Sequence, residues 1–246
     1  MHQLSAQELL HIWEIGKTQH PIDRALMILG TVFPEESQEE LASLSIGQRD
    51  TRLLHIREQL FRSKLAAVAD CPKCNEQLEF SLDAAKLIQA SPMNAPPATE
   101  HHLSADGFEL DYHPPNSLDL ATIVNNDDGM DGRQLLIEHC VTEIHRDGEK
   151  ISPADLPEEI ISLVADRIQE NDPQAEMQIE LSCPACCHQW QLLFDIVPYF
   201  WQEICAEAKR LLREVHILAR SYGWREADIL NMSAARRQIY LEMVTE

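Results

Sequence analysis

The segment Cys71-Pro-Lys-Cys74-Asn-Glu-Gln-Leu-Glu-Phe-Ser-Leu-Asp83 shares its pattern with a second segment, Cys183-Pro-Ala-Cys186-Cys-His-Gln-Trp-Gln-Leu-Leu-Phe-Asp195. Two thiolates on a tight turn followed by a strand form one knuckle of a zinc ribbon. Two such knuckles supply the four ligands of a tetrahedral site. The repeat therefore predicts one structural Zn²⁺ bound by Cys71, Cys74, Cys183 and Cys186. A closed four-sulfur shell leaves no coordination position for water or substrate.

The distance between the two knuckles along the chain is unusual for a ribbon. Between Cys74 and Cys183 lie 108 residues, so the ribbon must be discontinuous and interrupted by a long insert. A metal ion that closes so long a loop becomes part of the folding free energy.

Two details of the knuckles leave alternatives open. A glycine often follows the second cysteine, because the turn there is left-handed, but this chain has Asn75 and Cys187. Asn tolerates that conformation better than Cys does. Cys187 or His188 is an alternative ligand to Cys186, although the matching repeat favours Cys186. Two redox-active cysteine pairs are a further alternative, but such pairs open a helix after a strand, whereas strands follow these cysteines.

Composition narrows the class of protein. The formal net charge of −21 repels phosphate backbones and anionic membranes, so we expect neither as a partner. The seven cysteines are an odd number, and the N-terminus lacks the pattern of a signal peptide. Metal binding in a reducing compartment therefore fits better than a disulfide framework. We expect the protein in the cytoplasm.

Hydrophobic periodicity predicts a mainly α protein with a small β zinc ribbon. We expect an N-terminal helical region over residues 1–69, a ribbon made of 70–83 plus 177–195, and C-terminal helices over 196–246. The insert, residues 84–176, is expected to be mainly helical with a Pro-rich loop at 91–100. Single helices are predicted for residues 48–69 and 133–145.

The sequence contains little evidence for other functional sites. The sequence contains no phosphate-binding glycine loop and no nucleophile elbow, so we expect no enzymatic activity. Cys140 and Cys205 are predicted to be buried free thiols. Arg236 and Arg237 are predicted to lie on a solvated helix face, with docking on an acidic partner as the alternative.

Several segments together resemble a known family. They are Leu9-Leu10-His-Ile-Trp13-Glu14, Ile46-Gly47-Gln-Arg49-Asp50-Thr-Arg52-Leu53-Leu54, the two knuckles, Tyr222-Gly223-Trp224-Arg-Glu226-Ala-Asp-Ile229-Leu230, and Arg236-Arg237-Gln-Ile-Tyr240-Leu241. They are similar to the T4-type baseplate hub assembly chaperones, or T4 baseplate proteins, of phage-tail-like contractile injection systems. The resemblance covers nearly the whole chain, and the missing knuckle glycines are its one departure.

The resemblance implies a non-catalytic assembly factor, or a minor component, of the baseplate or its central hub. Its partners would be baseplate or hub proteins, and it would act in the cytoplasm or as part of the particle. A zinc-ribbon regulator that binds nucleic acid is the alternative function, which the negative charge disfavours.

Overall fold

Helices predominate in the computed structural model, which describes residues 2–88, 100–124 and 132–245, and three small antiparallel sheets accompany them. The expected fold class, mainly α with small β elements, is confirmed. The chain divides into two compact units. We call residues 1–35 with 196–246 the terminal unit, and residues 36–195 the central unit.

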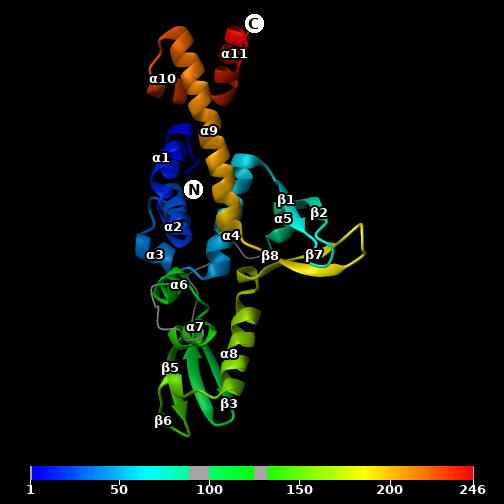
Figure 1. Cartoon of the computed structure of the whole chain (residues 1–246). Coiled ribbons are helices and arrows are strands. Elements are labelled where there is room, and N and C mark those ends of the chain that lie inside the picture. The colour runs from blue at the N-terminus through cyan, green and yellow to red at the C-terminus, as the bar shows by residue number, and fades with distance from the viewer. Residues whose placement is uncertain (1, 89–99, 125–131, 246) are drawn as a thin grey trace. The chain divides into compact units, whose positions relative to one another are not determined.

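The terminal unit consists of helices from both ends of the chain (Figure 1). They are α1 (Ala6–Gly16), α2 (Pro21–Val32), α9 (Ile196–Tyr222), α10 (Glu226–Leu230) and α11 (Ala234–Thr245). Ser5 and Glu8 form a capping box that starts α1, in which the Ser5 hydroxyl accepts from the Glu8 backbone N–H.

The long helix α9 is the centre of this unit, because the other four helices all pack on it. Its buried side chains recur at helical spacing, as in Phe200, Ile204, Leu211 and Leu218. This spacing puts them on one face, where they form the core of the unit.

The last helix, α11, is joined to α9 by a buried ion pair. The Arg237 Nε donates to Glu214 Oε2 at 2.8 Å, and both side chains are less than a tenth exposed. The prediction of a solvated face is therefore wrong for Arg237, whereas Arg236 is exposed as expected.

The central unit begins with two helices and contains two β-hairpins. The helices are α3 (Gln38–Ala42) and α4 (Ile46–Phe61). The first hairpin pairs β1 (Lys64–Asp70) with β2 (Gln77–Asp83), which α5 (Ala84–Leu87) follows. The second pairs β7 (Met177–Ser182) with β8 (Gln189–Phe194), directly after a 3₁₀ turn, η2 (Pro173–Ala175).

Between the hairpins lies a small α/β element. A four-stranded antiparallel sheet runs in the order β3 (His101–Ala105), β4 (Phe108–Tyr112), β5 (Val141–Arg146) and β6 (Glu149–Lys150). Its helices are α6 (Ser117–Val124), α7 (Gly132–Cys140) and α8 (Glu158–Asn171), with a 3₁₀ turn, η1 (Pro153–Asp155), before α8. Strands β3–β5 share one hydrophobic core with α7 and α8. Most of the expected Pro-rich loop lies outside the described residues.

Two predicted helices are shorter in the structure, and a strand follows each. The helix expected over 48–69 ends at Phe61, where Arg62 adopts a left-handed φ of 70° and the chain turns into β1. The helix expected over 133–145 ends at Cys140, because Val141–Arg146 pairs with β4. In both cases hydrogen bonding to a neighbouring strand outweighs local helical periodicity.

Candidate metal centre

The two Cys-Pro-x-Cys segments form knuckles with the same backbone hydrogen bonds. In the first, between β1 and β2, the Cys71 N–H donates to the Glu76 carbonyl and the Asn75 N–H to the Cys71 carbonyl, both at 2.9 Å. In the second, between β7 and β8, Cys183 donates to His188 and Cys187 to Cys183, again at 2.9 Å. The sequence repeat therefore corresponds to a repeat of local structure.

The residue after each second cysteine adopts the expected left-handed conformation. Asn75 and Cys187 both have a φ of 57°. Asn visits this region readily because its short polar side chain can hydrogen-bond locally, whereas Cys has no such compensation. Cys187 is therefore a strained position in the second knuckle.

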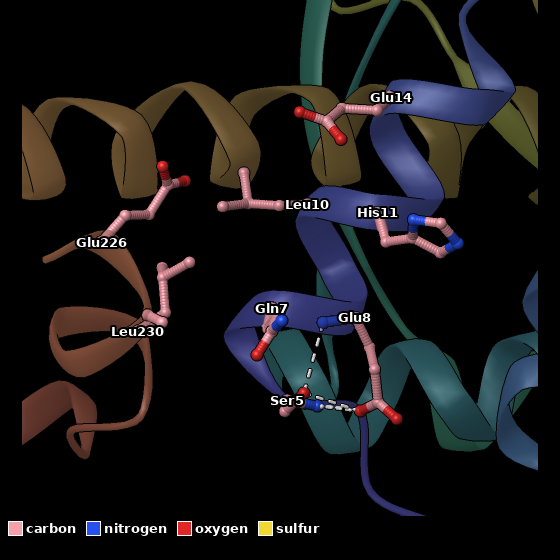
Figure 2. A pocket seen from close by; sticks show the side chains of 9 residues that line it. Ser5, Gln7, Glu8, Leu10, His11, Glu14, Glu226 and Leu230 are labelled. Carbon is pink, nitrogen blue, oxygen red and sulfur yellow. Dashed lines mark hydrogen bonds between the residues drawn. The ribbon is translucent and has the colours of Figure 1, made fainter.

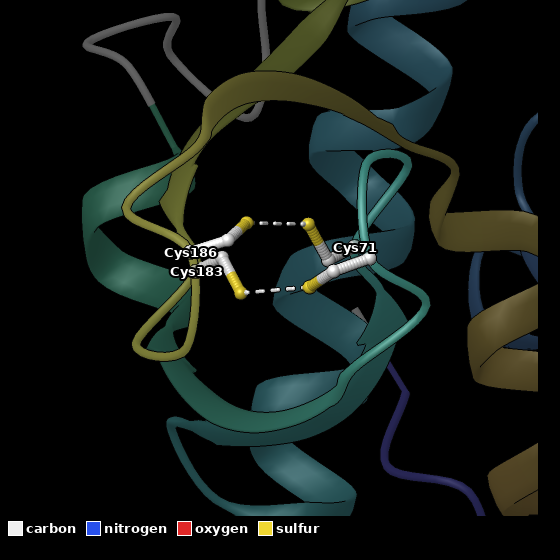
Figure 3. Close-up of side chains that lie close together, drawn as sticks. Cys71, Cys183 and Cys186 are labelled. Carbon is white, nitrogen blue, oxygen red and sulfur yellow. Dashed lines mark hydrogen bonds between the residues drawn. The ribbon is translucent and has the colours of Figure 1, made fainter.

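The four expected cysteines come together (Figure 3), and their Sγ atoms all lie within 4.8 Å of one another. The Cys71 and Cys186 sulfurs are 3.7 Å apart, and the Cys74 and Cys183 sulfurs 3.6 Å. A tetrahedron with metal–sulfur bonds of about 2.3 Å has edges of about 3.8 Å. A disulfide would need about 2.05 Å. These distances thus fit four thiolates around one metal ion.

The electrostatics of the cluster also favour a cation. Burial opposes ionisation of Cys71, but the backbone N–H groups of Lys73 and Cys74 outweigh it and lower the Cys71 pKa to about 7. At Cys74 the Glu76 N–H favours the thiolate, yet the sulfur of Cys186 and the other neighbouring thiols raise the pKa to about 12. Four thiols this close cannot all ionise unless a positive charge lies between them.

The alternative ligands and the other thiols lie outside this cluster. Cys187 is exposed, and the His188 ring stacks on Trp190 with the ring centroids 6.0 Å apart. Cys140 is buried as predicted, and burial raises the pKa of its thiol. Cys205 is only partly buried.

A layer of buried polar groups joins α4 to η2, just before the second hairpin. The Gly47 N–H donates to Asp172 Oδ2 at 2.9 Å, and a Cβ on Gly47 would clash with the Asp172 carboxylate. Beside it, the Arg49 Nε donates to Asp50 Oδ1 at 2.7 Å. Burial raises the Asp50 pKa to about 6, although Arg49 partly offsets it. The helical pattern of this segment did not reveal that its charged side chains are buried.

Side chains of His113, Asp119 and Cys140 form a second group with ligand atoms within 4.8 Å of one another. The Asp119 carboxylate already accepts from the Asn116 N–H at 2.9 Å and lies 3.8 Å from His113 Nδ1. This group was not predictable from the sequence, because its members lie in different parts of the chain and share no motif.

Fold and cluster together define a mainly helical protein with a discontinuous four-cysteine cluster that is compatible with a metal ion. A family model described as T4 bacteriophage base plate protein matches residues 6–201. The chain belongs to this family, as the resemblance predicted, and the family implies contacts with other baseplate proteins.

No match to this chain was found among curated proteins or among solved structures. Within the described residues, no helix is both long enough and apolar enough to span a membrane.

Proposed function

We propose that Cys71, Cys74, Cys183 and Cys186 bind one structural Zn²⁺. The supporting observation is the pair of sulfur–sulfur distances, 3.6 and 3.7 Å, close to the edge of a zinc–sulfur tetrahedron. The metal would tie the hairpin β1–β2 to the hairpin β7–β8 and so close the chain around the α/β element between them. Four protein ligands leave the ion no open position, so its role is structural.

The protein as a whole acts as a non-catalytic assembly factor, or minor component, of the baseplate or central hub of a phage-tail-like contractile injection system. The family match over residues 6–201 carries this proposal. A closed metal site and a strongly acidic chain suit a protein that works through protein–protein contacts.

Capture from cells that make the particle tests this function. A tagged full-length chain should co-purify with baseplate or hub proteins. Mass spectrometry of the finished particle should then distinguish the two roles, because a component is present in the particle and an assembly factor is not. If none of these proteins co-purified, the function would be wrong. Salt-sensitive binding to DNA or RNA in the same preparation would favour the zinc-ribbon regulator instead.

A further inference from the structure

The terminal unit has a groove between α1 and α10, with a volume of about 700 Å³ (Figure 2). We call it the α1–α10 groove. Apolar side chains form part of its lining: Leu10 from α1 and Ala227 and Leu230 from α10. Leu10 and Leu230 are only 5% and 7% exposed, so they form a fixed floor. Such a floor suits the aliphatic part of a side chain.

Carboxylates surround this floor. Glu8 and Glu14 come from α1 and Glu226 from α10, and in Figure 2 Leu10 lies between the side chains of Glu14 and Glu226. Among the residues that the structure describes, no lysine or arginine lines the groove. The groove therefore combines an apolar floor with a negatively charged rim.

The three carboxylates differ in whether they already have a partner. Glu8 accepts from the Ser5 backbone N–H at 2.8 Å and forms a hydrogen bond with His2, so its carboxylate caps the N-terminus of α1. Glu14 and Glu226 are exposed, and neither forms a salt bridge or side-chain hydrogen bond with any described residue. Their charges are available to a ligand.

The negative charge of the groove is local and does not simply reflect the acidity of the chain. The terminal unit contains 11 acidic and 9 basic residues, so its charges nearly balance. Several of its cations are engaged elsewhere: Arg237 with Glu214, and Arg225 with Asp228. The Arg24 guanidinium lies over the Trp201 ring.

We propose that the α1–α10 groove binds a lysine- or arginine-bearing segment of a baseplate or hub protein. The cationic groups of the segment donate to Glu14 and Glu226, and the aliphatic stem of a side chain packs on Leu10 and Leu230. Charge complementarity selects this occupant over an acidic or purely apolar one. The inference rests on the proposed function, because it names the chemistry of the partner that the function requires.

The test compares two double variants of the full-length chain in the capture experiment. Glu14→Gln with Glu226→Gln removes both free carboxylates at nearly constant size and leaves the Glu8 capping box intact. Glu35→Gln with Glu149→Gln makes the same charge change at exposed positions outside the groove. Circular dichroism and zinc content should be unchanged in both, which separates loss of binding from loss of fold.

We expect the groove variant to bind the captured partner at least about tenfold more weakly, with a weaker dependence on salt, because charge-assisted contacts are lost. The control variant should bind like the wild type. Equal binding and equal salt dependence in the groove variant and wild type would overturn this inference while leaving the proposed function standing. Failure of the wild type to capture any baseplate protein would count against the function itself.

Discussion

Replacing Cys183 by Ser probes the metal centre at its most buried point in the second knuckle. The side chain is 1% exposed, and its sulfur lies 3.6 Å from that of Cys74. A serine hydroxyl stays neutral near pH 7, and it is a much poorer zinc ligand than a thiolate. The substitution therefore removes one of four ligands without adding bulk.

The expected magnitude follows from the four-ligand shell. Structural Zn²⁺ sites contribute about 10–16 kcal/mol of apparent binding free energy. One ligand in four then corresponds to about 3–4 kcal/mol, or a roughly 10²–10³-fold loss of zinc affinity. Because the ion links two hairpins far apart in the sequence, the loss of zinc affinity should also lower the free energy of unfolding.

Competition with a chromogenic zinc chelator at pH 7.5 measures the affinity, and thermal unfolding with and without a strong chelator measures the stability. The matched control is Cys187→Ser, which replaces an exposed cysteine that follows Cys186 in the same knuckle but lies outside the cluster. It should keep the wild-type affinity. If Cys183→Ser retained stoichiometric zinc with unchanged affinity and stability, the four-cysteine assignment would be refuted.

Three further changes test other parts of the structure. Cys187→Gly should keep its zinc and raise the free energy of unfolding by up to about 1 kcal/mol, because glycine adopts a φ of 57° without strain; an unchanged or lower value in denaturant titrations would contradict this. Burial raises the Asp50 pKa to about 6, above its unfolded value, so the native state takes up a proton first as pH falls. Between pH 7.5 and pH 5.0, the free energy of unfolding of the wild type should therefore rise by about 1.4 kcal/mol relative to that of Asp50→Asn, as measured in denaturant titrations. Equal pH dependence of the two proteins would rule out the raised Asp50 pKa. Arg237→Ala should lower the free energy of unfolding by about 3 kcal/mol in denaturant titrations, because it leaves the buried Glu214 carboxylate with fewer partners. The exposed neighbour is the control, and Arg236→Ala should lower it by less than about 1 kcal/mol. Similar losses in the two variants would contradict the buried ion pair.

The four-cysteine cluster was predictable because its information is local and repeated. Each Cys-Pro-x-Cys turn sets its own backbone, including the left-handed residues Asn75 and Cys187, so the motif alone indicates how its thiols point. The helices of the terminal unit were also predictable, because their caps and apolar periods lie within each segment, as at Ser5.

Strands β1 and β5 were not predictable from their own residues. Leu65 pairs with Leu82, and Leu110 with Ile144, so each strand depends on a partner that lies outside its segment. The burial of the charged side chains of α4 was not predictable for the same reason. The partner of Gly47 is Asp172, 125 residues away, and no periodicity in the helix indicates that contact.

Metal stoichiometry of the purified wild-type chain tests the proposed four-cysteine zinc site without any substitution. Native mass spectrometry, with elemental analysis of the same sample, should find one Zn²⁺ per chain. After denaturation the metal should be lost and all seven cysteines should react as free thiols. A folded, metal-free chain, or one in which these cysteines form disulfides, would contradict the assignment of a structural Zn²⁺ to these four cysteines.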